Sequence, residues 1–283
     1  LVAGDMTMTG QIPYPVGDIP FEEFVSVYKE QARLLAEAGV DLFVIETMMS
    51  LQECRAAVIA MREVCDLPIM ATLTFNEEGR TLYGTTPEVG VVVLQSLGVD
   101  AIGVNCSLGP KALSGIVGEY LKYASIPVIL KPNAGLPKSV DGKTVFDVLP
   151  PEFAEDVTEL IKKGVRIAGG CCGTTPEYIG ELVKKSGDVT VKPIEEKNIT
   201  CVSSYTHAVV FDKKPVLIGE RINPTGKKRF KEALKANDID YILKEGIAQQ
   251  EKGVDILDVN VGLPEIDEEK MLKTAVCELQ AII

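Results

Sequence analysis

The sequence has a single histidine, His207, among 283 residues. This scarcity argues against a histidine-rich metal site, and a Ser-His-Asp triad cannot readily be assembled from it. His207 lies in a polar stretch and is predicted to be a surface residue. Basic residues are also in short supply, because Lys and Arg total 29 against 41 Asp and Glu, a net charge of -12. Such an excess of acid disfavours binding to the phosphates of nucleic acids.

Long apolar runs are missing too, since none approaches the roughly 20 residues that span a membrane. We therefore predict neither a nucleic-acid partner nor a membrane partner. Hydrophobic residues nevertheless make up 46% of the chain, enough to bury a full core. The seven cysteines are an odd number and suit a reducing compartment better than a disulfide framework. The predicted location is therefore the cytoplasm.

A short sequence motif, which marks the end of a predicted helix and the start of a predicted strand, recurs along the chain. Leu97-Gly98-Val99-Asp100 leads into AIGVNC, and similar motifs precede LFVIET and IAGGCC. Glycine is common after helices and β-branched residues favour strands, so each motif marks one strand-helix unit. Alternating strands and helices predict a parallel sheet with right-handed crossovers. Six strands are predicted, at Val2–Gly4, Leu42–Thr47, Ile69–Phe75, Ala101–Cys106, Val128–Asn133 and Val165–Cys171.

The predicted fold class is α/β, as a TIM-type (β/α)8 barrel followed by the start of a second barrel. A closed barrel needs eight strands, so we expect two N-terminal strand-helix units to be absent from this sequence. The predicted domains are an incomplete first barrel at 1–187, a linker at 188–214 and an incomplete second barrel at 215–283. Within the first barrel, capping boxes are predicted to begin two helices, Ser50 with Glu53 and Thr174 with Glu177.

Three cysteines stand where two of the predicted strands end. Cys106 closes the GVNC motif, and Cys171 and Cys172 lie between glycines in GGCCGT. Adjacent cysteines are poor disulfide partners, but they can donate two thiolates to one soft metal ion, with a third arriving from another strand. Three cysteines with an open fourth position make a catalytic type of zinc centre. The alternative is that they are small buried residues, although the flanking glycines favour a backbone that turns closely around an ion.

Other polar residues at the predicted strand ends are candidate substrate ligands, because barrel enzymes carry their chemistry there. Glu46 ends an apolar strand and is predicted to hold a substrate ammonium group. Its alternative is a structural partner for a lysine or a helix N-terminus. Asn133 is predicted to orient a substrate or to lend its amide oxygen to the metal, the alternative being a turn residue. Asp5 and Thr47 complete the predicted substrate-binding set.

The motifs GVNC, KPNAG and GGCCGTTPEYI resemble those of the homocysteine S-methyltransferase family, which includes betaine-dependent enzymes and cobalamin-dependent methionine synthases. The resemblance runs from Leu1 to about Val189. It implies a zinc ion bound by Cys106, Cys171 and Cys172, with the thiol of homocysteine as the incoming ligand. The sequence departs from the family in lacking the Asp-Gly-rich motif of the first strand.

Two later motifs, GERINPTG and DVNVG, resemble the opening of pterin-binding barrels, including the methyltetrahydrofolate domain of cobalamin-dependent methionine synthases. This second resemblance covers Pro215–Ile283. Four residues at predicted strand ends are candidates for the folate pocket, with purely structural roles as their alternative. They are Glu220, Asn223, Asp258 and Asn260.

The order of the two resemblances implies the N-terminal part of a cobalamin-dependent methionine synthase. Homocysteine, activated on zinc, would accept a methyl group from methylcobalamin, and 5-methyltetrahydrofolate would recharge the cobalamin. The cobalamin would be carried by a module outside this sequence, in the same chain or in a partner. Two alternatives stay open: a cobalamin-independent homocysteine S-methyltransferase that uses a betaine or sulfonium donor, and a structural or redox thiol site on a barrel scaffold.

Overall fold

The computed structural model describes residues 1–212 and 214–283, so that Lys213, within the predicted linker, lies outside the described residues. The described chain forms two compact units. The first consists of Leu1–Gln11, Ile19–Ile199 and Tyr205–Ala208, and the second of Ile12–Asp18, Thr200–Ser204 and Val209–Ile283. None of the described helices is long and apolar enough to cross a membrane.

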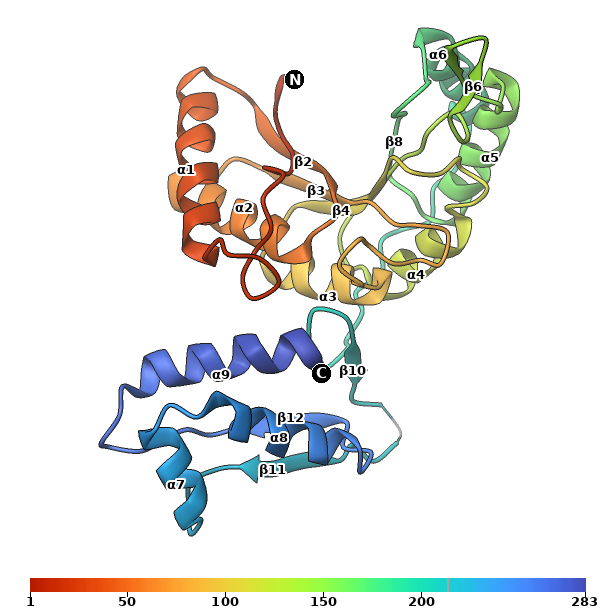
Figure 1. Cartoon of the computed structure of the whole chain (residues 1–283). Coiled ribbons are helices and arrows are strands. Elements are labelled where there is room, and N and C mark those ends of the chain that lie inside the picture. Colours follow the sequence, from red (N-terminus) through yellow and green to blue (C-terminus); the bar gives the residue numbers. More distant parts are fainter. Residues whose placement is uncertain (213) are drawn as a thin grey trace. The chain divides into compact units, whose positions relative to one another are not determined.

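The first unit is built on a six-stranded sheet with the order β1-β2-β3-β4-β5-β8, and all of its neighbouring strands are parallel. Its helices follow the outer side of the curved sheet (Figure 1). The predicted α/β class with a parallel sheet is confirmed, and all six predicted strands are present. The elements are β1 (Ala3–Met6), α1 (Phe21–Glu37), β2 (Leu42–Met48), α2 (Leu51–Val64), β3 (Ile69–Leu73), α3 (Pro87–Ser96), β4 (Ala101–Asn105), α4 (Ser114–Tyr123), β5 (Val128–Lys131), α5 (Pro150–Lys163), β8 (Ile167–Ala168) and α6 (Pro176–Ser186). A small antiparallel hairpin, β6 (Lys138–Val140) and β7 (Lys143–Val145), lies between β5 and α5.

Several strands end earlier than the sequence predicts. β5 ends at Lys131 instead of Asn133, and β8 ends at Ala168 instead of Cys171. Their polar residues belong to the turns that follow the sheet. The reason is that the backbone leaves the hydrogen-bonded ladder at these points, as it does at Cys106, whose φ is +64°. The candidate site is therefore made of residues just beyond the strands.

Of the two predicted capping boxes, the one at Thr174 is wrong and the one at Ser50 forms only by half, because the Glu53 side chain bonds to Tyr28 and Thr9 and not to the Ser50 N–H. Ser50 caps α2 as predicted, because its hydroxyl oxygen accepts a hydrogen bond from the Glu53 N–H at 3.2 Å. Thr174 does not cap α6, whose preceding residue is Thr175 and whose N-terminus has no side-chain cap. The Thr174 hydroxyl instead donates to the carbonyl oxygen of Cys171 at 2.7 Å, so it closes the turn that carries the cysteine pair.

The side chain of Glu53 has a role that the sequence pattern does not reveal. It is fully buried and accepts hydrogen bonds from the Tyr28 hydroxyl at 2.7 Å and from the Thr9 N–H at 2.5 Å. Tyr28 lies on the buried face of α1 together with Phe24 and Ala32. Glu53 therefore ties the chain after β1 and the helix α1 to the start of α2.

The second unit is smaller and begins with two parallel strands, β11 and β12. β11 begins three residues later than the predicted strand start at Pro215. The chain is fixed there by the Asp255 side chain, which accepts a hydrogen bond from the Leu217 N–H at 2.8 Å. Ile222, Phe230 and Ala275 belong to its buried core. The elements are β11 (Ile218–Ile222), α7 (Lys228–Lys235), α8 (Ile239–Gln250), β12 (Ile256–Val259) and α9 (Glu268–Ile282). Two short strands, β9 (Cys201–Ser203) and β10 (Ala208–Val210), pair with each other in the predicted linker.

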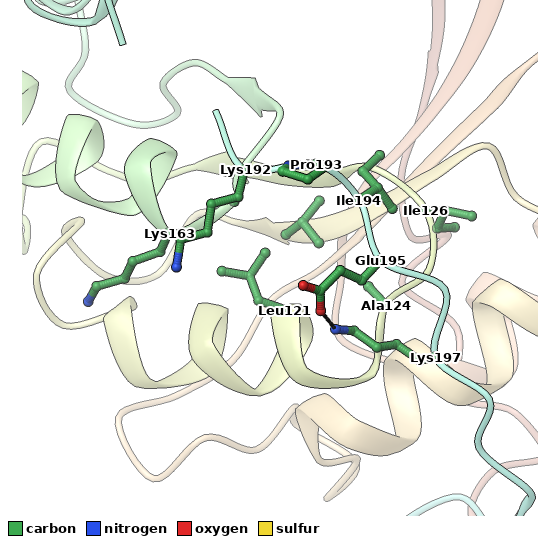
Figure 2. A pocket seen from close by; sticks show the side chains of 11 residues that line it. Leu121, Ala124, Ile126, Lys163, Lys192, Pro193, Ile194, Glu195 and Lys197 are labelled. Carbon is green, nitrogen blue, oxygen red and sulfur yellow. Dashed lines mark hydrogen bonds and ion pairs between the residues drawn. The ribbon is translucent and has the colours of Figure 1, made fainter. Parts of the chain in front are cut away.

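A pocket of about 180 Å³ lies in the first unit at the end of the sheet where the strands begin (Figure 2). Val128, the first residue of β5, lines the pocket, and so do Lys192, Pro193, Ile194, Glu195 and Lys197 of the segment drawn across it in Figure 2. This segment is held by the Lys197 N–H, which donates to the Ser125 hydroxyl at 2.7 Å. Because the candidate cysteines follow the opposite ends of the strands, the pocket is not part of their site.

The close approach of β4 and β5 yields a stability prediction at Gly103. A Cβ atom there would lie 2.0 Å from the carbonyl oxygen of Ile129, so the two strands would have to separate. We expect Gly103→Ala to lower the free energy of unfolding by about 3 kcal/mol in chemical denaturation. The matched control is Gly118→Ala in α4, where a Cβ meets nothing within 4 Å. This control should stabilise by about 0.5–1 kcal/mol, and equal losses in both variants would contradict the packing argument.

Candidate metal centre

Three cysteine sulfurs meet at the carboxyl end of the first unit's sheet. Cys106 follows β4, whereas Cys171 and Cys172 follow β8, two strands away. Their sulfur atoms all lie within 4.8 Å of one another, and those of Cys106 and Cys172 are 3.9 Å apart. Within residues 1–212 and 214–283, no other set of three or more His, Cys, Asp or Glu side chains converges in this way. The structure thus brings together the three predicted ligands.

The segment that ends β5 and follows it makes main-chain hydrogen bonds to both cysteine-bearing arms, which are the turns after β4 and after β8. The Cys106 N–H donates to the carbonyl oxygen of Lys131 at 3.0 Å. The Cys171 N–H donates to the carbonyl oxygen of the next residue, Pro132, at 2.9 Å. Two successive carbonyls of one segment therefore fix two cysteines that are far apart in sequence.

Asn133 positions the third cysteine. Its side-chain oxygen accepts a hydrogen bond from the Cys172 N–H at 3.0 Å, and the carbonyl oxygen of Cys172 accepts from the Ala134 N–H at 3.0 Å. The Asn133 side chain is only 3% exposed. In this structure its amide oxygen thus serves the backbone turn, which was the alternative to a role at the metal or the substrate.

Asn105 is the polar centre of the site, although no role was predicted for it from the sequence. Its side-chain oxygen accepts from the Thr47 N–H at 2.8 Å and from the Thr72 hydroxyl at 2.7 Å. Its side-chain N–H donates to the Thr47 hydroxyl at 2.8 Å and points to the Cys171 sulfur at 3.7 Å. One buried amide therefore connects β2, β3, β4 and the cysteine pair. An amide directly before a candidate ligand, at the end of an apolar strand, was the signal available in the sequence.

The backbone is strained at the same place. Thr47, Cys106 and Ser107 have φ values of +57°, +64° and +64°, a left-handed region that costs a non-glycine residue about 1–3 kcal/mol. The two hydrogen bonds between Thr47 and Asn105 offset this cost. A register shift between β2 and β3 also falls between Ile45 and Met48. Such irregularities change the direction of side chains beside functional sites, and here the irregular stretch contains Glu46 and Thr47.

Glycine is required on the other arm. Gly173 has a φ of +80°, and a Cβ atom there would lie 2.4 Å from the ring of Phe146. Only a glycine therefore lets the chain turn back immediately after Cys172. This agrees with the prediction that the glycines around the cysteine pair permit a tight turn.

The thiols perturb one another. A hydrogen bond from Cys171 lowers the pKa of Cys106 to about 7, and the same bond, together with burial, raises the pKa of Cys171. Near neutral pH the cluster therefore readily carries one negative charge, on the Cys106 thiolate. Further thiolates at this spacing would repel each other unless a cation lay between them.

These features fit a zinc ion. Thiolate sulfurs are soft ligands, and none of these three cysteines forms a disulfide bond. Cys172 is exposed and Cys106 and Cys171 are partly exposed, so an incoming ligand can reach the cluster from solvent. The donor set therefore suits a three-cysteine zinc centre with one position left for a substrate.

A second group of charges, which includes two of the predicted substrate ligands, lies at the same end of the sheet. Glu46 forms an ion pair with Lys131, whose side chain is 22% exposed against 27% for that of Glu46. The alternative of a lysine partner for Glu46 is therefore realised in this structure. Burial raises the pKa of Asp5, Glu46 raises it further, and Lys131 lowers it. Lys131 was missed from the sequence, although a lysine that ends the apolar run VILK was a visible signal.

The four predicted folate residues lie in the second unit. Asn223 follows β11 and Asn260 follows β12, and the Asn260 N–H donates to the carbonyl oxygen of Ile222 at 2.9 Å. The two asparagines thus stand at one edge of the small sheet. Glu220 and Asp258 lie inside their strands and are exposed, so their prediction as strand-end residues is wrong. Glu220 accepts a hydrogen bond from the Asn223 side chain.

We predict that each of the three cysteines is needed for zinc binding. Structural zinc contributes about 10–16 kcal/mol through four ligands, so the loss of one ligand should cost at least about 2.5 kcal/mol, or roughly 100-fold in affinity. The variants Cys106→Ser, Cys171→Ser and Cys172→Ser should each show this loss in a competition titration with a zinc chelator. The control is Cys65→Ser, a partly exposed cysteine at the end of α2, which should bind zinc like the unaltered chain. A normal affinity in any of the three variants would contradict the site.

Comparisons with known proteins agree with this geometry. The homocysteine S-methyltransferase family profile matches residues 1–186. A methionine synthase of Mycobacterium leprae (strain TN) is 34% identical over 274 residues, which cover 92% of this chain and 23% of that protein. A methionine synthase of Mycobacterium tuberculosis (strain ATCC 25618 / H37Rv) is 32% identical over 268 residues, which cover 92% of this chain and 22% of that protein. The chain thus spans less than a quarter of the length of these relatives.

Among solved structures, the homocysteine methyltransferase MmuM from Escherichia coli is similar. Its apo form gives a TM-score of 0.53 at 24% identity, covering 66% of this chain and 62% of that chain. Its metallated form gives a TM-score of 0.51 at 22% identity, covering 60% of this chain and 53% of that chain. At this level of identity the likeness shows a common fold. Since the family profile matches well over half of its residues, this chain belongs to the homocysteine S-methyltransferase family.

Proposed function

We propose that this chain is the homocysteine-activating part of a cobalamin-dependent methionine synthase. The single observation that carries the proposal is the convergence of Cys106, Cys171 and Cys172, whose sulfurs lie within 4.8 Å of one another. Family membership supplies the expected substrate, a thiol that can take the remaining position of a three-cysteine zinc ion. Zinc bound there would deprotonate that thiol, and three thiolate ligands would keep the sulfur electron-rich enough to accept a methyl group.

The chain's own residues would fix this arrangement before substrate arrives. The carbonyls of Lys131 and Pro132 and the amide of Asn133 hold the three ligands by their backbone N–H groups. The Asn105 side chain, 1% exposed, points its N–H to the Cys171 sulfur and would stabilise negative charge on it. Glu46 and Asp5 lie together at the same edge of the sheet, where a substrate ammonium group would be attracted.

The proposed architecture is a TIM-type barrel for the first unit and the start of another barrel for the second. The first is supported by the consecutive order of β1 to β5 and β8 and by helices along one side of the sheet. The proposed domains keep the boundaries 1–187, 188–214 and 215–283. Residues 188–199 of the linker pack with the first unit.

The proposed methyl donor is methylcobalamin on a module outside this sequence, recharged from 5-methyltetrahydrofolate at the second unit. Similarity to methionine synthases over 92% of the chain, which includes residues of both units, supports this choice over a betaine or sulfonium donor. Asn223 and Asn260 are the proposed pterin contacts, because they follow β11 and β12 at one edge of the small sheet. A cytoplasmic location is proposed as well, supported by the odd number of seven cysteines in the sequence, which suits a reducing compartment.

The proposed function predicts methionine formation by the full-length protein from homocysteine, methylcobalamin and 5-methyltetrahydrofolate. Removal of zinc with a chelator should abolish the product, and added zinc should restore it, because the substrate thiol is otherwise mostly protonated at neutral pH. Chromatographic detection of methionine is the measurement. Methionine made from betaine or from a sulfonium donor without cobalamin would support the alternative and contradict the proposal.

The folate proposal makes a separable prediction. Asn223→Ala and Asn260→Ala should each weaken binding of 5-methyltetrahydrofolate to the full-length protein by about tenfold, as expected for the loss of one or two hydrogen bonds. Methyl transfer from supplied methylcobalamin to homocysteine should stay unchanged, because that half of the reaction uses the first unit. Lys270→Ala, at the start of α9, is the control in the second unit. Folate affinity that is unchanged in both asparagine variants would remove these residues from the pterin site.

A further inference from the structure

The Lys131–Glu46 ion pair is the strongest feature of the site that the zinc chemistry does not use. Lys131 ends β5, and its carbonyl oxygen already holds the N–H of Cys106 at 3.0 Å. Its side chain extends to the Glu46 carboxylate of β2. Both side chains are about three-quarters buried, so their pairing is screened by solvent less than that of the exposed ion pairs of this chain.

The charges around this pair do not cancel. Asp5 is close enough for both Glu46 and Lys131 to shift its pKa, in opposite directions. No ion pair joins Asp5 to any of the residues that the structure describes. Two carboxylates thus face one ammonium group at this edge of the sheet. The edge of the sheet has an excess of negative charge that attracts a further cation.

We propose that Lys131 is a resident counter-ion of Glu46 that a substrate's α-ammonium group must displace or share, so that Lys131 weakens the binding of amino thiols. The inference rests on the proposed function, since it takes the substrate to be an amino acid with a thiol side chain. A lysine suits this role because its ammonium group is a compact charge on a flexible stem. The stem runs past Gly169, where a Cβ atom would lie 3.5 Å from the Lys131 Cγ.

Such a counter-ion neutralises the Glu46 carboxylate before a substrate ammonium group binds. A largely buried carboxylate close to another carboxylate is unfavourable without a cation. Lys131 supplies that cation, while the four lone-pair positions of the Glu46 carboxylate leave room for a second donor. If Lys131 stays in place, repulsion between the two ammonium groups lowers substrate affinity. If Lys131 moves away, the loss of its ion pair with Glu46 lowers that affinity. Lys131 is therefore a positioning residue that sets selectivity between charged ligands.

The test uses the zinc-loaded full-length protein and three thiols in calorimetric titrations. The probes are homocysteine, 3-aminopropane-1-thiol, which lacks the carboxylate, and 4-mercaptobutanoate, which lacks the ammonium group. Lys131→Met should bind the two ammonium-bearing thiols roughly tenfold more tightly, because a competing charge is gone. Its affinity for 4-mercaptobutanoate should not increase.

Two further variants separate this effect from a change in folding. Lys131→Gln should reproduce the result of Lys131→Met, and Lys138→Met, which removes an exposed lysine paired with Asp147, should change nothing. In the background Glu46→Gln, the gain from Lys131→Met should vanish, because the two residues act as a pair.

The outcomes distinguish the inference from the proposed function. Weaker binding of homocysteine and 4-mercaptobutanoate by Lys131→Met would overturn the inference, since Lys131 would then contact the substrate carboxylate. Unchanged affinities for all three thiols would also overturn it. If the unaltered protein loads zinc but binds no homocysteine, or does not load zinc, the proposed function itself fails.

Discussion

The structure depends on one constraint, that two separate arms of the chain must present their thiols to the same point. Cys106 and the pair Cys171 and Cys172 follow different strands, and the segment 131–134 between them bonds to both arms. These bonds are made by the backbone and by the buried Asn133 amide, so they position the cysteines without using their sulfur atoms. The ligands are thus preorganised, which is what lets a metal bind without ordering a loop.

The same edge of the sheet concentrates strain and charge. The left-handed backbone at Thr47 is held by hydrogen bonds to Asn105, that at Cys106 by the bond of its N–H to the Lys131 carbonyl, and the Glu46 carboxylate is balanced by Lys131. Elsewhere the first unit follows ordinary packing rules, with a parallel sheet against amphipathic helices. Local departures from low-energy geometry that gather in one place are typical of functional sites. Here Thr47, Cys106 and Ser107, three of the five described non-glycine residues with a positive φ, lie at or beside the three thiols.

Local patterns in the sequence were sufficient for the strands, the α/β class and the three cysteines, because these follow from periodicity and residue chemistry. They were not sufficient for contacts between distant residues. Asn105 and Thr47 are 58 positions apart, and Lys131 and Glu46 are 85 apart, so neither pairing is visible in a local pattern. The cap predicted at Thr174 failed for a related reason, since its hydroxyl found a carbonyl in the cysteine turn. Strand ends were placed too late because the turns at the site continue the strand composition without the strand hydrogen bonds.

The central claim is that Cys106, Cys171 and Cys172 share one zinc ion and leave a position for the sulfur of homocysteine. X-ray absorption at the zinc edge of the full-length protein measures this directly by counting sulfur neighbours. We expect three sulfur neighbours without substrate and four with homocysteine, whereas homoserine, which has a hydroxyl in place of the thiol, should add none. Four sulfur neighbours before substrate is added, or a count that homocysteine does not change, would contradict it.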